Sequence, residues 1–138
     1  MSDAGVSQNR GRKFDLQLSQ ALIDERRLGE IFACDKIVRP DWRVELKSES
    51  WLWEQTGNIC AEFRQNGEPS GVAVTDADWW VHELKRDGAT LVYLMFPIER
   101  LKALARRAYA EGRYREGVGD GGRFGAVLIP LSWITRDD

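Results

Sequence analysis

The 138-residue sequence has few of the residues that hold small proteins together by covalent or metal cross-links, with only two cysteines and one histidine. Cys34 and Cys60 have no partner cysteine or histidine at the spacing of a zinc site, so we expect two small, buried, reduced thiols in a cytosolic protein. A chain of this length can bury a sufficient core without such cross-links. The sequence therefore predicts a domain that needs neither disulfides nor structural zinc.

Long hydrophobic runs are also missing. No run approaches the roughly 20 apolar residues that a membrane span requires, and residues 1–13 lack the apolar core of a signal peptide. We expect residues 1–13 to form a flexible polar arm and residues 14–138 to form a single domain. The expected location is the cytoplasm, with no membrane partner.

The sequence has no excess of charge of one sign, since its formal net charge is -2. This balance disfavours a protein that simply coats DNA with basic residues. It does not disfavour a nuclease, which combines an acidic site with a basic groove. The distribution of charge therefore matters more than its sum.

Hydrophobic periodicity predicts the elements of the domain. Helices are expected over residues 14–32 and from Pro97 to about Gly112, and an Asp87-Gly88 hairpin turn is expected between two strands. The predicted extended segments are 37–49, 58–65, 79–84, 89–96 and 126–131. The order α-β-β-β(-β)-α-β predicts an α/β (α+β) domain with a mixed sheet flanked by helices.

Charged residues gather in the first two extended segments. Side chains two residues apart share a face of a strand, so Glu45, Lys47 and Glu49 project to one side. If the apolar faces of both strands pack the same way, Glu62 of the second segment becomes a near neighbour of Glu45 and Lys47, because cross-strand residues stand about 5 Å apart. The residues that share the face of Glu62 are Asn58, Cys60 and Arg64.

This set of side chains has two interpretations. Two close carboxylates repel each other unless a cation lies between them, so Glu45 and Glu62 could hold Mg²⁺ or Mn²⁺. Lys47 could then steer the attacking water or neutralise the charge that builds on a phosphate during hydrolysis. The alternative is a salt-bridged polar sheet face, and spacing alone favours it because E-x-K is common on strands.

The motifs around these residues resemble those of phage-encoded proteins with features of PD-(D/E)XK nucleases. The similarity extends from the first helix to the end of the chain. The late stretch GVGDGGRFGAVLIPL belongs to it. The other matching motifs are Glu45-x-Lys47-x-Glu49, Thr56-Gly57-Asn58, Glu62, Pro69-Ser70-Gly71 and Thr75-x-Ala77-Asp78-Trp79.

This resemblance implies a restriction-endonuclease-like core and a Mg²⁺-dependent deoxyribonuclease in the cytoplasm of a host cell. Glu45 and Glu62 would be the metal ligands, Lys47 the catalytic cation, and Glu49 a supporting residue. Glu25 resembles the extra carboxylate that such nucleases take from their first helix. In the usual arrangement E-x-K follows the aspartate strand, whereas here it lies on the earlier strand.

The expected substrate is DNA, with a branched or mismatched structure because no sequence-reading module is recognisable. Six cations fall within residues 102–123, and they could follow a DNA backbone or form a solvated helix face. The predicted substrate-binding residues are Asn58, Arg64, Ser70, Arg106 and Arg107.

Three features leave alternatives open. Trp51 and Trp53 could stack on bases or form a homodimer interface, as in an assembly protein. His82 and Asp78 are expected to be structural. The alternative function is a catalytically inactive DNA- or protein-binding module on the same fold, such as a phage regulator or an inhibitor of host defence.

Overall fold

The structure is a computed structural model that describes residues 22–23, 25–30 and 42–136. The chain divides into two units, Met1–Asp41 and Trp42–Asp138. In the first unit residues 22–23 and 25–30 are helical, within the helix predicted over 14–32. The predicted arm over 1–13 and Cys34 lie outside the described residues.

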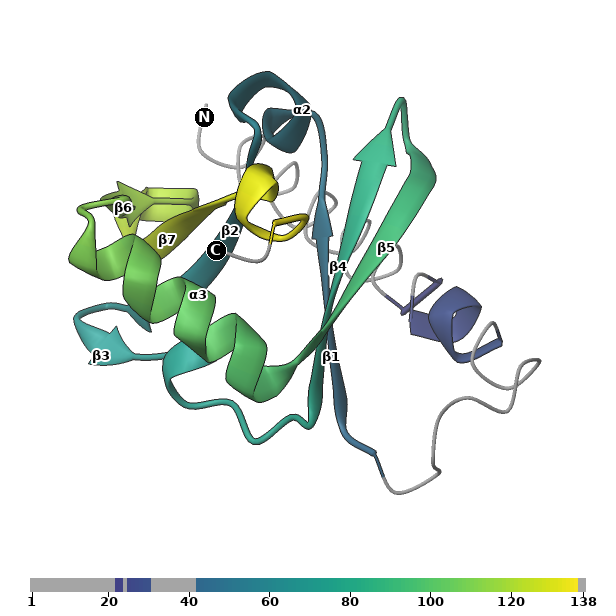
Figure 1. Cartoon of the computed structure of the whole chain (residues 1–138), viewed down its shortest axis with the longest axis horizontal. Coiled ribbons are helices and arrows are strands. Elements are labelled where there is room, and N and C mark those ends of the chain that lie inside the picture. Colours follow the sequence, from purple (N-terminus) through teal and green to yellow (C-terminus); the bar gives the residue numbers. More distant parts are fainter. Residues whose placement is uncertain (1–21, 24, 31–41, 137–138) are drawn as a thin grey trace, which may run out of the picture. The chain divides into compact units, whose positions relative to one another are not determined.

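The first sheet of the second unit has three strands, in the order β1-β4-β5. Its strands are β1 (Val44–Glu49), β4 (Trp79–Arg86) and β5 (Ala89–Pro97). β1 runs parallel to β4, and β5 runs antiparallel to it after the predicted Asp87-Gly88 turn. β1 is therefore an edge strand, and β4 is the central strand (Figure 1).

The second sheet has four antiparallel strands in the order β3-β2-β7-β6. Its strands are β2 (Asn58–Gln65), β3 (Glu68–Pro69), β6 (Tyr114–Val118) and β7 (Phe124–Pro130). No strand was predicted where β6 lies, because the glycines and charges of this stretch hide the strand pattern. β7 contains most of the strand predicted over 126–131.

The expected pairing of β1 with β2 is wrong, since the two strands belong to different sheets. The reason is α2 (Leu52–Thr56), a helix of 5 residues in the segment that the sequence predicted to be a loop. Trp53 of this helix is buried and donates a hydrogen bond from its indole nitrogen to the carbonyl of Lys85 at 2.9 Å. α2 is thereby held at the end of β4, and the chain leaves the first sheet for the second.

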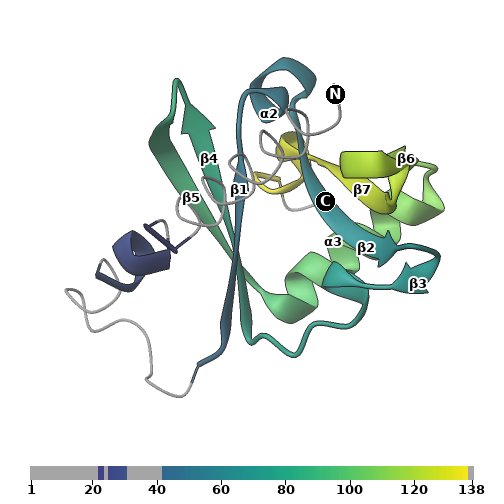
Figure 2. The ribbon, with the colours of Figure 1, turned by 180° about the vertical axis from the view of Figure 1, so that it is seen from behind.

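One long helix, α3 (Ile98–Ala110), packs against β7, β5 and β4 (Figure 2). It starts directly after Pro97, as the sequence predicted, because proline fits the first turn of a helix. Leu101, Leu104 and Ala108 are buried on the side that faces the sheets. Burial of such side chains contributes about 1.5–3 kcal/mol each for the leucines.

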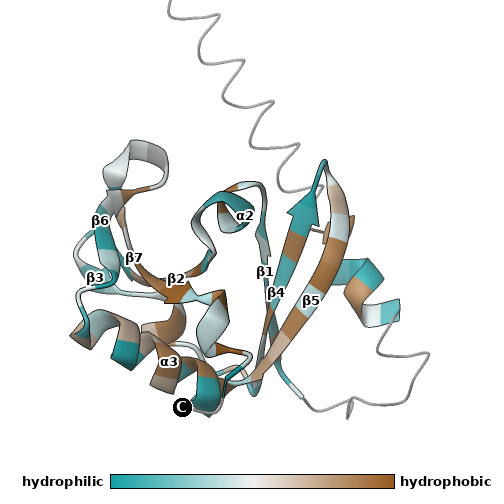
Figure 3. Cartoon of the chain, turned by 45° about the horizontal axis from the view of Figure 1, so that its top comes forward, coloured by the Kyte–Doolittle hydropathy of each residue, from teal (hydrophilic) through white to brown (hydrophobic). Residues whose placement is uncertain are grey.

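The core lies between the two sheets and α3, with buried side chains from β2, β4, β7 and α3 and with Phe96 of β5. Figure 3 shows the hydrophobic residues along β2, β5 and α3. Its largest fully buried hydrophobic side chains include Trp80, Ile59, Leu101 and Ile129. Three short 3-10 turns complete the unit: η1 (Gly71–Ala73), η2 (Asp120–Gly122) and η3 (Leu131–Trp133). The mixed α+β class is confirmed, with two sheets in place of the single mixed sheet that was expected.

Among the described residues, no helix combines the length and the hydropathy of a membrane span.

Candidate functional site

Three of the predicted site residues form a row on the edge strand β1. We call Glu45, Lys47 and Glu49 the β1 row. In the parallel register with β4, these residues pair with Trp80, His82 and Leu84 in that order. Because paired residues of neighbouring strands share a face, the β1 row lies on the same face of the sheet as His82 and Trp80.

The outer part of the β1 row is accessible to solvent. The Lys47 ammonium lies 3.1 Å from Oε1 of Glu45, and these side chains are 44% and 43% exposed. The same ammonium lies 5.6 Å from the centre of the Trp80 ring, at the range of a cation–π contact. A ligand from solvent can therefore reach both the carboxylate and the ammonium.

The inner part of the β1 row connects the two sheets. Oε1 of Glu49, whose side chain is only 14% exposed, accepts a hydrogen bond of 2.5 Å from the backbone nitrogen of Cys60 on β2. The same oxygen lies 3.3 Å from Nδ1 of His82. Glu49 thus joins the end of β1 to the start of β2, although these strands are not neighbours within a sheet.

His82 is fully buried, and its contacts assign its tautomer. Its Nε2 accepts a hydrogen bond of 3.0 Å from the indole N–H of Trp80, so the proton of a neutral ring must be on Nδ1. That nitrogen faces Glu49 but has no well-aligned hydrogen-bond partner among the described residues. The prediction that His82 is structural agrees with this burial and these contacts.

The thiol of Cys60 lies next to this carboxylate. Burial of the thiol, together with the negative charge of Glu49, raises the pKa of Cys60 from 9.0 to about 11, although the residue as a whole is exposed. Its thiol is therefore protonated at neutral pH. Because the thiolate is the reactive form, the raised pKa lowers the reactivity of Cys60 at neutral pH.

Glu62, the second predicted metal ligand, lies in the other sheet. Its Oε2 accepts a hydrogen bond of 2.8 Å from the hydroxyl of Ser70, just before η1. Within the described ranges, no hydrogen bond or ion pair connects Glu62 to Glu45 or Lys47. These ranges also hold no group of three or more His, Cys, Asp or Glu side chains placed to bind one metal ion.

Several residues of the recognised motifs have structural contacts. The carboxylate of Asp78 accepts a hydrogen bond of 2.8 Å from the backbone nitrogen of Arg43, which fixes the start of β4 beside β1. The backbone nitrogen of Asn58 donates to the hydroxyl of Thr56 at 3.2 Å, at the end of α2. Arg64 forms an ion pair of 2.5 Å with Glu116 on β6. Substrate binding by Asn58 and Arg64 stays a prediction.

A second buried carboxylate, Glu83, was not singled out by its sequence pattern. It is fully buried on the opposite face of β4 from His82. Its two oxygens accept hydrogen bonds of 2.8 Å from the hydroxyls of Ser48 and Thr90, and the Lys85 ammonium lies 3.4 Å away. The sequence around Glu83 gives no sign of this burial, because a charged residue that alternates with Trp80, His82 and Leu84 is expected on an exposed face.

The basic residues of α3 are divided between two places. Arg107 stacks on the ring of Trp133, 3.9 Å from its centre, and lies 3.6 Å from Glu111. Lys102 and Arg106 form no ion pair with any carboxylate in the described part of the chain. They project beside a pocket of about 360 Å³ between α3, β2 and η1. Of the predicted substrate-binding residues, only Arg106 lines this pocket.

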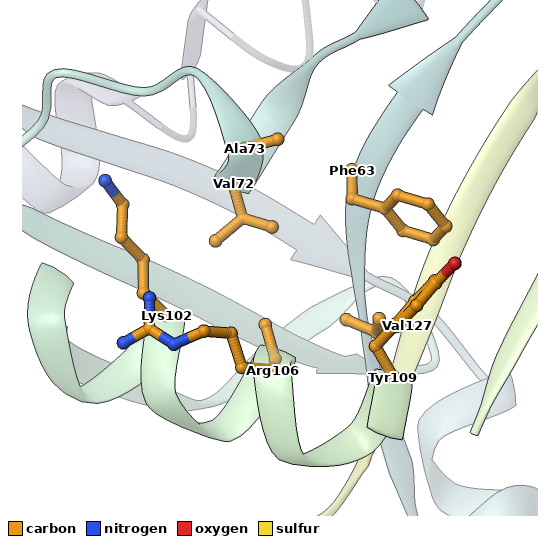
Figure 4. Close-up of a pocket in the computed structure, with 8 residues that line it drawn as sticks. Phe63, Val72, Ala73, Lys102, Arg106, Tyr109 and Val127 are labelled. Atoms are coloured by element: carbon orange, nitrogen blue, oxygen red, sulfur yellow. The ribbon is translucent and has the colours of Figure 1, made fainter. Parts of the chain in front are cut away.

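The side of the pocket away from these cations is aromatic (Figure 4). The ring of Phe63 meets that of Tyr109 edge-on, with 5.6 Å between centroids. Tyr109 also stacks on Tyr114 at 4.6 Å. Phe63, Lys102 and Tyr109 were not predicted to line a pocket, because only the fold brings β2 beside α3.

Glu25 is an exposed residue of the helical segment in the first unit. Its supporting role stays a prediction.

Comparisons with known proteins identify no relative: no protein-family model, no curated protein sequence and no solved structure matches the chain.

Proposed function

We propose that this protein is a metal-dependent nuclease that hydrolyses phosphodiester bonds of DNA at the outer β1 row. The observation that carries the proposal is the half-exposed pair of Glu45 and Lys47, with 3.1 Å between carboxylate and ammonium on one face of an edge strand. The Glu45 carboxylate can bind a metal cation, and the neighbouring Lys47 ammonium can bind a phosphate. The similarity to phage-encoded PD-(D/E)XK nuclease-like proteins supports the same activity.

The donor set suits a hard cation. Mg²⁺ is usually held by one or two carboxylates together with waters and substrate phosphates, so it does not need a cage of three protein ligands. Glu45 would hold it. Glu62 stays a predicted second ligand, because it lies on the other sheet, where its carboxylate accepts a hydrogen bond from Ser70. When bound, the ion would polarise a phosphoryl oxygen and lower the pKa of a bound water.

The other residues have supporting tasks. Lys47 would neutralise the negative charge that develops on the phosphate. Glu49 would keep the row in place, because its carboxylate joins β1 to the backbone of β2. Trp80 would restrict the position of the ammonium through its ring face.

The test is a cleavage assay on supercoiled plasmid and on branched DNA, with Mg²⁺ or Mn²⁺ and then with chelator. We expect metal-dependent cutting that falls at least about 100-fold in Glu45→Gln and in Glu62→Gln. Glu68→Gln, which changes an exposed carboxylate of β3 in the same way, should cut like the unchanged protein. Cutting that persists in chelator, or that is equal in all three variants, would contradict the proposal.

A binding module without catalysis is the second candidate, and the charge of α3 favours it. The helix has four basic residues and one acidic residue, and Lys102 and Arg106 have no ion-pair partner among the described side chains. Each phosphate that a cation neutralises makes DNA affinity more sensitive to salt. A salt-sensitive gel shift without cutting under any metal condition would favour this candidate over the nuclease.

A further inference from the structure

The pocket beside α3 has the dimensions and lining of a ligand site, and the proposed hydrolysis does not use it. We call it the α3 pocket; its walls are Phe63, Val72, Tyr109 and Val127, with Lys102 and Arg106 at one end. Its volume of about 360 Å³ falls in the range of small-molecule sites, which are mostly apolar with a few polar groups that orient the ligand.

The two cations give one end of the α3 pocket its charge. Figure 4 shows Lys102 and Arg106 rising from α3 on the same side, away from the rings of Phe63 and Tyr109. Neither cation is neutralised by a carboxylate in the described ranges, so their charge remains available to a ligand. A guanidinium next to an ammonium suits a phosphate, since the first offers paired donors and the second a point charge.

The other end of the α3 pocket suits a flat ring. Tyr109 is fixed between two aromatic neighbours, with Tyr114 stacked at 4.6 Å and Phe63 edge-on at 5.6 Å. Rings that are already held in place lose little conformational entropy when a ligand packs on them. Val72 and Val127 complete an apolar surface for such a ring.

We propose that the α3 pocket binds a single nucleotide, with its base against Phe63 and Tyr109 and its phosphate at Lys102 and Arg106. An apolar wall at one end and two unpaired cations at the other match a planar base joined to a phosphate. The choice of a nucleotide over another aromatic anion rests on the proposed function, in which the substrate is DNA. The pocket would hold one unstacked nucleotide of that substrate.

The pocket is also connected to a predicted catalytic residue. Val72 belongs to η1, which follows Ser70 directly, and the hydroxyl of Ser70 donates to Glu62. A base that presses on Val72 would therefore bear on the same segment that holds the Glu62 carboxylate. Binding of a nucleotide in the α3 pocket would therefore influence the position of the Glu62 carboxylate.

The test is a titration of the full chain with thymidine monophosphate in chelator, followed by NMR shifts or calorimetry. We expect Lys102→Gln and Arg106→Gln each to weaken binding about tenfold, as expected for loss of a charge-assisted hydrogen bond. Arg100→Gln removes the same charge from the same helix outside the α3 pocket and should change affinity less than about twofold. Thymidine, which has no phosphate, should bind at least about tenfold more weakly than thymidine monophosphate.

A further variant tests the apolar end. Ala73 is exposed and lines the pocket, so Ala73→Trp should fill the opening without disturbing the core, and it should abolish binding while the unfolding midpoint is kept. Absence of binding at millimolar nucleotide would overturn the inference. Equal affinity for thymidine and its monophosphate would also overturn it, as would equal affinities of the Arg100, Lys102 and Arg106 variants.

The two proposals fail separately. Nucleotide binding that depends on Arg106 in a protein that never cuts DNA would refute the nuclease and keep the pocket. Cutting that depends on Glu45 and Glu62, together with nucleotide binding that ignores Arg106, would refute the pocket and keep the nuclease.

Discussion

At the scale of the residue, Gly71 of η1 lies closely against β2. A Cβ atom at this position would lie 2.2 Å from the backbone oxygen of Glu62. The residue also has φ +51°, in the left-handed region that disfavours side chains. The Pro-Ser-Gly motif therefore has a structural reason that is independent of chemistry: only glycine lets this segment lie against the strand of Glu62.

Gly71→Ala should lower the free energy of unfolding by roughly 3 kcal/mol, because it adds both backbone strain and a clash with a main-chain oxygen. Gly67→Ala is the matched control, since that residue has φ +80° but a Cβ atom there would have no other atom within 4 Å. It should cost only about 1 kcal/mol. Urea unfolding of both variants measures the difference. Equal losses in the free energy of unfolding would show that the contact of Gly71 with Glu62 does not affect stability.

The surroundings of Cys60 change the titration of its thiol. Its pKa of about 11 predicts that alkylation by iodoacetamide at pH 8 is about 100-fold slower than for a thiol at the ordinary value of 9.0. Glu49→Gln should speed the reaction, because the charge that helps to raise the pKa is removed. The alkylation rate of Cys60 is measured in a Cys34→Ser background. A rate in the folded protein equal to that of the chain unfolded in urea would contradict the raised pKa.

The same shift has a consequence for stability. The folded protein holds the Cys60 proton more tightly than the unfolded chain, so the thiol stabilises the fold below about pH 9. This contribution should be lost as the pH rises towards 11. As the pH rises from 9.0 to about 11, the denaturation midpoint of the protein should therefore fall relative to that of Cys60→Ala, which has no thiol at this position.

At the scale of the element, β1 has two ends with different tasks. Glu49 at the inner end is largely buried and accepts the backbone hydrogen bond from Cys60, whereas Glu45 at the outer end is half-exposed and forms an ion pair with Lys47. Hydrogen bonds to charged groups contribute about 1.5–3 kcal/mol, while exposed ion pairs contribute about 0–1 kcal/mol. The inner end of β1 thus connects the two sheets, and the side chains of the outer end are accessible to a ligand.

Glu49→Ala should therefore destabilise the protein by about 2–3 kcal/mol, because it leaves the Cys60 nitrogen without its acceptor. Glu45→Ala, the matched change four residues earlier on the same face, should cost less than about 1 kcal/mol. Thermal or urea unfolding of the pair decides the point. A larger loss for Glu45 than for Glu49 would contradict the division of β1 into two ends.

The elements differ in how well their sequences predict them. α3 is predicted closely, because Pro97 starts it and Leu101, Leu104 and Ala108 mark one face. The partners of β1 and β2 were not predicted, since periodicity gives the faces of a strand but not its neighbours. The five residues of α2 decide the pairing, and Trp53 within them looks like an exposed loop residue until its burial is known.

The candidate site shows the same limit. The alternation of β1 correctly places Glu45, Lys47 and Glu49 on one face. It could not show that this face is shared with His82, because that contact requires β4 as a parallel neighbour. The α3 pocket could not be predicted either, since its aromatic and basic residues come together only when α3 packs on the second sheet.

At the scale of the whole molecule, opposite charges are kept on separate elements. The net charge of the chain is only -2, yet α3 has four basic residues against one acid while β1 has two acids and one lysine. A protein of this kind can attract DNA through one surface and hold a divalent cation at another. We therefore propose that DNA affinity comes mainly from α3 and that cleavage takes place at the outer β1 row.

The most direct test of this assignment is single-turnover cleavage of labelled branched DNA by Lys47→Gln, with DNA affinity measured on the same sample. The account predicts that cutting falls about 100-fold or more while affinity changes less than about twofold. Arg100→Gln, which removes one cation from α3, should leave the cutting rate of bound DNA unchanged. Full cutting by Lys47→Gln, or a loss of DNA affinity that accounts for all of its lost activity, would contradict a catalytic role of Lys47.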